Sequence, residues 1–325
     1  MKMRRRELFA TSIAGAAAAI VGMPARAQNF PSKPVRWIIP FAPGGNYDVT
    51  SRLVGEVMGR RLGQTVLPDN RPGAGGVIGL EAAVAAPADG YTVVMGSFSV
   101  MWIAPYMAGK PSMVPLFAPI SLLTTVPTLV VTKADSRFAD IKSALAEAKA
   151  KPGTVSIGHP GNGTTNHVAI LRLQVNENVK FNIIPYKGSG PGLADLLAGQ
   201  IDLYADQLTT SLPHIRAGKL KPLLALSGDR ITQLPNVPSL KDIGSKPFDG
   251  GTTAGVLARA ETPVASLDVL NAAVVAALKD EEVTRKLVDL GAEVRPTTRA
   301  EFAAHLKDQE AGVSELVKSG LLKPE

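Results

Sequence analysis

Two glycine turns, each followed by helical spacing, are the stretches of this sequence best suited to binding chemistry. In the first, the apolar run Trp37–Ile39 leads into PGGNYD at residues 43–48 and then into a helical pattern. Glycine lets backbone N–H groups approach a bound group closely, and the first N–H groups of a helix have no partner inside it. The positive end of the helix dipole adds to this, so the turn suits a carboxylate or a phosphate.

The second turn, HPGNGTTNH at residues 159–167, resembles a phosphate-binding loop because Gly158 and Gly163 have the required separation. Thr164 stands where that loop needs a lysine, so the charge of a nucleotide phosphate would be unmatched. Nucleotide hydrolysis is therefore excluded. A neutral turn remains, with the hydroxyls of Thr164 and Thr165 at a helix start, and it suits one or two carboxylate oxygens.

Catalytic and metal-binding patterns are absent from the sequence. It has no G-x-S-x-G elbow, no H-E-x-x-H motif and no cysteine, and its four histidines are scattered. An enzyme would have to use Asp48, His167 and Asp206, and Asp48 is equally well explained as a charge that favours a helix start. Lys187 is either a solvated turn residue or a charge near a cleft. We expect no enzyme activity, no metal and no cofactor.

The positive charge of the chain is concentrated at its N-terminus. Of 35 basic and 28 acidic residues, five basic and one acidic lie in the first 27 residues. The remaining residues therefore include 30 basic and 27 acidic side chains, a net charge of +3. A chain this close to neutral lacks the excess of basic residues that is typical of nucleic-acid-binding proteins.

The first 27 residues have the pattern of an export signal. A basic start precedes the mild apolar segment 8–23, and ARA at 25–27 is a typical cleavage pattern. RRELF at 5–9 resembles a twin-arginine signal, with an ordinary secretory signal as the alternative. The apolar segment is shorter than the ~20 residues that span a membrane. We expect removal near Ala27 and a periplasmic mature chain.

Short apolar runs alternate with helical stretches along the mature chain, which predicts two α/β lobes. Residues 34–99 and 133–220 each show this alternation. The extended segment 120–132 is expected to cross between the lobes, and 221–232 to cross back. Ligands of such sheets bind beyond the carboxyl ends of the strands, and concave sites favour domain interfaces. The lobe boundaries predicted from this pattern are 28–125 with 230–325 for lobe 1, and 126–229 for lobe 2.

Several unusual segments, in order along the chain, resemble the substrate-binding receptors of tripartite tricarboxylate transporters, the Bug family. They are PSKPVRWIIPFAPGGNYDVTSRLV, NRPGAGG, PADGYT, GNGTTNH, FNIIPYKGSGPGLADLLAGQIDLYADQL and IRAGKLKPLLALSGDRITQLPNVPSL. The resemblance implies a type II periplasmic-binding-protein (Venus flytrap) fold that closes on a carboxylate-bearing solute. It also implies an extracytoplasmic receptor, expected to be a monomer, that delivers its ligand to the permease subunits of a tripartite transporter.

The resemblance also implies where the carboxylate is held, largely by backbone N–H groups and bridging water from one turn of each lobe. The expected ligand-binding residues are Pro43, Gly44, Gly45, Asn46, Tyr47, Asp48, Ser97, Asn162, Gly163, Thr164, Thr165, His167, Tyr186, Lys187, Gly188 and Asp206.

The sequence departs from the family at the first turn, where a glycine and a threonine are common and this chain has Asn46 and Tyr47. Trp102 also stands where a smaller polar residue is expected. Our hypothesis is that Tyr47 and Trp102 favour an aromatic or otherwise planar carboxylate. The alternatives that the sequence leaves open are an aliphatic dicarboxylate as ligand, a sensor kinase as partner, or a periplasmic enzyme on the same fold.

Overall fold

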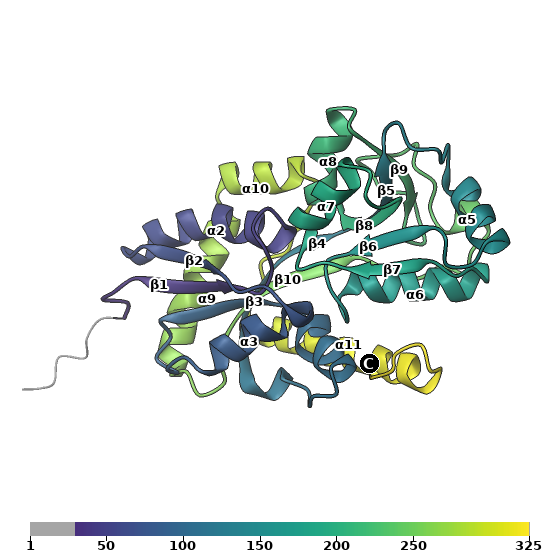
Figure 1. The fold of residues 1–325 in the computed structure, drawn as a ribbon. Coiled ribbons are helices and arrows are strands. Elements are labelled where there is room, and N and C mark those ends of the chain that lie inside the picture. The colour runs from purple at the N-terminus through teal and green to yellow at the C-terminus, as the bar shows by residue number, and fades with distance from the viewer. Residues whose placement is uncertain (1–29, 325) are drawn as a thin grey trace, which may run out of the picture.

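The computed structural model describes residues 30–324. The predicted export signal at 1–27 lies outside these residues. Within 30–324, no helix combines the length and the apolar character needed to cross a bilayer. The described chain forms two α/β halves, each built on its own sheet, and Figure 1 shows the sheets side by side.

The first sheet has six strands in the order β11-β4-β10-β3-β1-β2. Their bounds are β1 Val35–Ile39, β2 Val66–Asn70, β3 Thr92–Gly96, β4 Phe117–Val126, β10 Thr252–Arg259 and β11 Glu293–Val294. β1 pairs in parallel with β2 and β3, whereas β10 runs antiparallel to β3 and β4. The reversal arises because β10 returns from the second sheet and runs away from the boundary between the halves, which β1, β2, β3 and β4 approach.

The second sheet has five strands in the order β7-β6-β8-β5-β9. Their bounds are β5 Thr128–Lys133, β6 Ser156–His159, β7 Asn182–Pro185, β8 Leu203–Gln207 and β9 Leu220–Ala225. β6 pairs in parallel with β7 and β8, and β5 is antiparallel to its two neighbours. Each sheet is therefore mixed. The antiparallel strand of the second sheet is β5, where the chain enters from the first half. The first sheet has two, β10 where the chain returns and the short β11, which pairs with β4.

Helices cover the faces of both sheets, as expected for sheets with parallel strands. Around the first sheet they are α2 Asn46–Leu62, α3 Val77–Val84, α4 Ala104–Met107, α9 Val264–Leu278, α10 Glu281–Asp289 and α11 Arg299–Lys318. Around the second they are α5 Ile141–Ala150, α6 Thr165–Glu177, α7 Ser189–Leu197 and α8 Leu208–Arg216. α11 continues through Gly312 because a single glycine costs a helix only about 1 kcal/mol.

The apolar run that precedes the first glycine turn is a fully buried strand. Trp37, Ile38 and Ile39 have no exposed surface, because helices cover both faces of β1. A parallel strand buried on both faces reads as a continuous apolar run, which is the signal seen in the sequence. This strand fixes the position of the turn at residues 43–48 relative to the sheet.

The first crossing between the halves lies inside the predicted segment 120–132. β4 ends at Val126 in the first sheet and β5 begins at Thr128 in the second, with Pro127 between them. Proline cannot donate to a sheet ladder, so it suits a change of sheet.

The second crossing was predicted too early, and so was the end of lobe 2 at residue 229. Residues 226–250 stay with the second sheet: Leu240 is buried in its core, and Gly250 donates its N–H to the Leu226 carbonyl at 2.9 Å. The chain returns only between Gly250 and Thr252, where β10 begins. This segment has little regular secondary structure, so only its tertiary contacts assign it to the second half.

Candidate ligand-binding site

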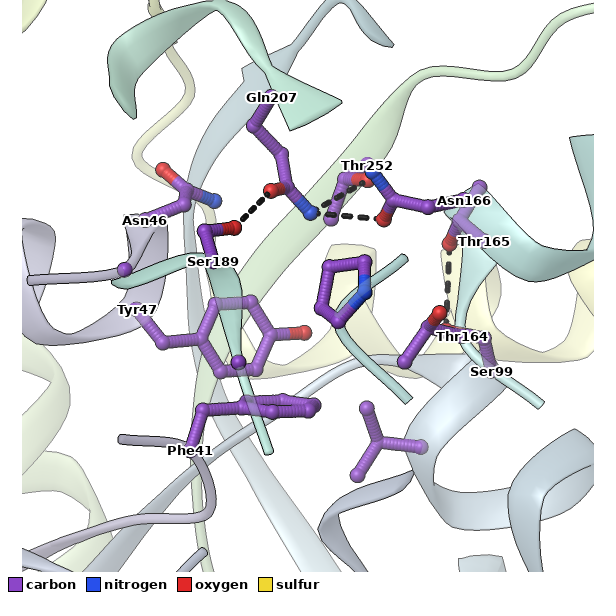
Figure 2. A pocket seen from close by; sticks show the side chains of 14 residues that line it. Phe41, Asn46, Tyr47, Ser99, Thr164, Thr165, Asn166, Ser189, Gln207 and Thr252 are labelled. Atoms are coloured by element: carbon purple, nitrogen blue, oxygen red, sulfur yellow. Dashed lines mark hydrogen bonds between the residues drawn. The ribbon is translucent and has the colours of Figure 1, made fainter. Parts of the chain in front are cut away.

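A cavity lies between the two halves, beyond the carboxyl ends of β1, β3, β6, β7 and β8. Figure 2 shows the side chains around it. The lining residues are Phe41, Gly45, Asn46, Tyr47, Ser99, Val100, Pro160, Thr164, Thr165, Asn166, Gly188, Ser189, Gln207 and Thr252. None of these described residues carries a charged side chain.

Three helix N-termini from both halves reach this cavity. Gly45, Thr164 and Gly188 are the N-caps of α2, α6 and α7, and all three line it. The first N–H groups of each helix have no partner inside the helix and lie at the positive end of its dipole. Gly45 and Gly188 have no side chain that could cap these groups. The cavity wall is therefore rich in neutral donors that suit an anion.

Hydrogen bonds to the Asp48 carboxylate hold the first turn in place. This carboxylate accepts the Gly44 N–H at 3.0 Å, Arg52 Nε at 2.9 Å and Asn70 Nδ2 at 3.0 Å. Burial opposes ionisation, but these hydrogen bonds hold the pKa of Asp48 below its usual value. Asp48 does not line the cavity, so its part is to fix the turn rather than to touch a ligand.

Among the lining side chains of the described structure, only Asn46 has a buried nitrogen or oxygen atom without any hydrogen-bond partner. Its Oδ1 accepts Thr209 Oγ1 at 2.9 Å and Thr50 Oγ1 at 3.4 Å. Its Nδ2 is buried and unpaired, and the side chain is only 3% exposed. In Figure 2 the amide nitrogen faces the inside of the site.

The second turn is organised by Thr164 and by a pair of buried histidines. Thr164 Oγ1 donates to the Gly161 carbonyl at 2.7 Å and accepts the His167 N–H. His167 Nδ1 accepts the Gly163 N–H at 3.3 Å, and its ring stacks on His159 with centroids 4.4 Å apart. Burial lowers the pKa of His167 to about 4, so the imidazole is neutral and serves as an acceptor at neutral pH.

A row of neutral polar side chains forms one wall of the cavity. Gln207 Nε2 donates to Asn166 Oδ1 at 2.8 Å and contacts Thr252 Oγ1 at 3.5 Å, while Gln207 Oε1 accepts Ser189 Oγ at 3.0 Å. The neighbouring Asp206 is fully buried away from the cavity, where it accepts Thr210 and Ser211, and burial raises its pKa. The residue that faces the cavity at this strand end is thus Gln207.

An apolar wall lies opposite the polar row in Figure 2. Phe41 and Tyr47 meet edge to face at 5.3 Å, and Val100 and Pro160 continue the surface. The Tyr47 hydroxyl donates to the Thr253 carbonyl at 3.2 Å, so its ring is fixed. Trp102 does not line the cavity, contrary to our hypothesis. It lies between Phe98 and Tyr106, with ring centroids at 6.0 and 5.3 Å.

The two halves touch across the cavity, so the structure is closed. The Ala42 N–H of the first half donates to the Lys187 carbonyl of the second at 2.9 Å. Thr165 Oγ1 reaches Ser99 Oγ at 3.2 Å. Glycines allow the close approach: a Cβ at Gly190 would lie 2.5 Å from the Pro43 carbonyl oxygen.

The structure brings part of the expected set into the cavity wall. Six expected residues line it: Gly45, Asn46, Tyr47, Thr164, Thr165 and Gly188. Ten expected residues do not, and most of them support the turns or lie behind them: Pro43, Gly44, Asp48, Ser97, Asn162, Gly163, His167, Tyr186, Lys187 and Asp206. Lys187 contributes its carbonyl to the contact with Ala42, and the Tyr186 hydroxyl donates to Asp195 at 2.8 Å.

Eight lining residues were missed: Phe41, Ser99, Val100, Pro160, Asn166, Ser189, Gln207 and Thr252. Most lie within two positions of an expected residue, such as Ser189 after Gly188. The sequence signal located the turns, but which of two adjacent residues faces inward depends on the fold. In addition, the described residues contain no cluster of three or more side chains that could hold a metal ion.

Comparison with known proteins gives a consistent result. Residues 50–321 match the family model described as the tripartite tricarboxylate transporter family receptor. The chain is 34% identical to protein BugT of Bordetella pertussis over 283 residues, which cover 85% of this chain and 86% of BugT.

Three solved structures share the fold over their whole length. The periplasmic binding protein BugD is 30% identical, with a TM-score of 0.86 over 91% of this chain and 100% of its own. MatC from Rhodopseudomonas palustris, with bound malate, is 29% identical, with a TM-score of 0.82 over 89% and 100%. An R. palustris protein with adipate is 26% identical, with a TM-score of 0.85 over 91% and 100%. The two-lobe fold of periplasmic binding proteins is thereby confirmed.

Proposed function

Because this chain belongs to the tripartite tricarboxylate transporter receptor family, we propose that it is a periplasmic receptor for one small carboxylate, which it delivers to a tripartite permease. The observation that carries the carboxylate is the convergence of the α2, α6 and α7 N-termini on one cavity. Their N–H groups and dipoles favour an anion, and exclusion of water on closure strengthens each of these interactions.

Neutral donors hold the ligand in this proposal. The cavity wall of the described residues has no arginine or lysine side chain, so binding replaces the hydration of the carboxylate with fixed N–H groups rather than with an ion pair. The apolar wall of Phe41, Tyr47, Val100 and Pro160 contacts the body of the ligand. An aromatic or a short aliphatic body would pack against this wall.

Closure couples binding to delivery. The carboxylate first meets the donors of one half, and the other half then closes onto it by a hinge at Pro127 and at Gly250–Thr252. A ligand shifts the population toward the closed form by its differential affinity for that form. The closed monomer presents both halves in a fixed arrangement, and this arrangement is what the permease subunits recognise.

A thermal-unfolding screen of the chain from residue 28 onward tests the carboxylate proposal. The probes are malate, adipate, benzoate and terephthalate, each paired with its neutral primary amide. A carboxylate at ~100 times its dissociation constant adds about 2.7 kcal/mol to the stability of the folded state, and its amide adds far less. Equal stabilisation by an acid and its amide, or stabilisation by none of the acids at millimolar concentration, would contradict the proposal.

A further inference from the structure

The amide of Asn46 presents a buried donor to the cavity in addition to the backbone N–H groups of the three helix N-termini. Nδ2 has no partner in the described structure, and the side chain is 97% buried. A buried donor left unpaired costs about 1–3 kcal/mol, which corresponds to a factor of about 5 to 150 in an equilibrium constant. A ligand atom that accepts from this group recovers that cost.

The orientation of this amide is set from the opposite half of the molecule. Thr209, in the first turn of α8, donates its hydroxyl to Asn46 Oδ1 at 2.9 Å. Thr50, one helical turn along α2, makes a longer contact of 3.4 Å with the same oxygen. With Oδ1 occupied on the side away from the cavity, Nδ2 faces inward. The Thr209 contact joins the two halves, so it can be sensitive to their closure.

We propose that Asn46 determines ligand specificity and that Thr209 positions it on closure. The receptor then prefers carboxylates that carry a second hydrogen-bond acceptor, such as the other carboxylate of a dicarboxylate, where Asn46 Nδ2 can donate to it. A ligand that places a methyl group there closes the lobes over an unpaired amide. This inference rests on the proposed carboxylate binding and adds the chemistry of the second group.

Two pairs of probes test the preference by isothermal titration calorimetry: adipate against hexanoate, and terephthalate against 4-methylbenzoate. In each pair one carboxylate is replaced by a methyl group at nearly constant shape. For any pair that binds, the wild-type chain should favour the dicarboxylate by about ten- to a hundredfold. Asn46→Leu, which removes the donor, should reduce this ratio to near one.

Variants of the two threonines test the part played by closure. Thr209→Val keeps Asn46 but leaves its amide free to rotate, so the ratio of dicarboxylate to monocarboxylate affinity should fall by about tenfold. Thr209→Ser should restore this ratio, because serine again supplies the hydroxyl donor. Thr50→Val, the matched control in the same half as Asn46, should keep most of the ratio. A purely structural effect of these variants would lower the affinity for both members of a pair equally.

The outcomes separate this inference from the proposed function. Carboxylate binding with a ratio that Asn46→Leu and Thr209→Val both leave unchanged overturns the inference and leaves the proposed function intact. A wild-type preference for the methyl-bearing member also overturns it, because the amide oxygen would then face the cavity. Binding of neither member of either pair, and of no other carboxylate screened, overturns the proposed function as well. Circular dichroism of each variant verifies its fold.

Discussion

At the scale of single residues, the stacked histidines of the second turn connect stability to pH. His159 and His167 are both buried, and burial lowers their pKa values to about 3 and about 4, with the neighbouring His167 adding to the shift of His159. Their neutral rings accept the Gly161 and Gly163 N–H groups. In the unfolded chain both titrate near 6.5.

We predict that the free energy of unfolding falls as the pH is lowered from 7 to 5. In that window the unfolded chain binds protons at these histidines and the folded chain does not, so acid favours unfolding. With folded pKa values this low, each buried histidine contributes a loss of about 2 kcal/mol over the two pH units. Urea unfolding at pH 7, 6 and 5 measures the change.

His167→Gln isolates the effect, because the amide oxygen can still accept the Gly163 N–H but does not titrate. The loss between pH 7 and 5 should shrink by about 2 kcal/mol in this variant. Comparing the two chains cancels the contribution of Asp206, whose raised pKa acts in the opposite direction. An identical pH dependence in both chains would show that His167 is not buried in its neutral form.

At the scale of elements, the joint between β1, β2 and α2 determines the shape of the first turn. Asp48 on α2 receives the Gly44 N–H from the turn and the Asn70 amide from the end of β2. Asn70 also donates to the Phe41 carbonyl at 3.0 Å. The turn is thus held by hydrogen bonds from both flanking elements, which places the α2 N-terminus at the cavity.

Asp48→Asn should therefore destabilise the fold by about 1–2 kcal/mol and weaken carboxylate binding several-fold, because the amide retains only part of the hydrogen-bonding capacity. The matched control is Glu56→Gln in the same helix. Its ion pair with Arg60 is exposed, so the change should cost less than about 0.5 kcal/mol and leave binding unaltered. Denaturant unfolding and ligand titration of both variants provide the comparison; equal effects of the two changes would rule out a special role for Asp48.

At the scale of the whole molecule, the closed form depends on glycines that let the halves approach. Gly190 at the start of α7 lies against the Pro43 carbonyl of the first half, and a Cβ there would come within 2.5 Å of that oxygen. Gly75 faces the Asn162 carbonyl of the second half in the same way. Real Cβ atoms do not approach backbone oxygens so closely, so a side chain at Gly190 obstructs closure without disturbing either half.

We predict that Gly190→Ala lowers carboxylate affinity at least about tenfold while the free energy of unfolding changes by less than about 1 kcal/mol. Small-angle X-ray scattering should show that a bound carboxylate contracts the wild-type chain and not the variant. Gly312→Ala is the control, since a Cβ there meets no atom within 4 Å inside α11. It should stabilise the helix by about 0.5–1 kcal/mol and leave the contraction intact. A Gly190→Ala chain that contracts normally would refute the closure argument.

The sequence alone determined the features that depend on local patterns. The continuous apolar run of β1, the helical spacing of α2 and the glycines of both turns are short-range signals, and each element formed where its pattern placed it. Pro127 likewise interrupts an extended segment at the point where the chain changes sheets. The motifs of the resemblance lie in these same turns and strand ends, which is why the family could be recognised.

Only the tertiary structure decided which residues face the cavity. Adjacent residues at a strand end point in opposite directions, so Gln207 faces the cavity while Asp206 is buried behind it. The second crossing moved to Gly250–Thr252 because contacts with the second core, rather than any periodic pattern, hold residues 226–250. The Asn46 amide accepts a hydrogen bond from Thr209, which is 163 positions away in the sequence and belongs to the other half.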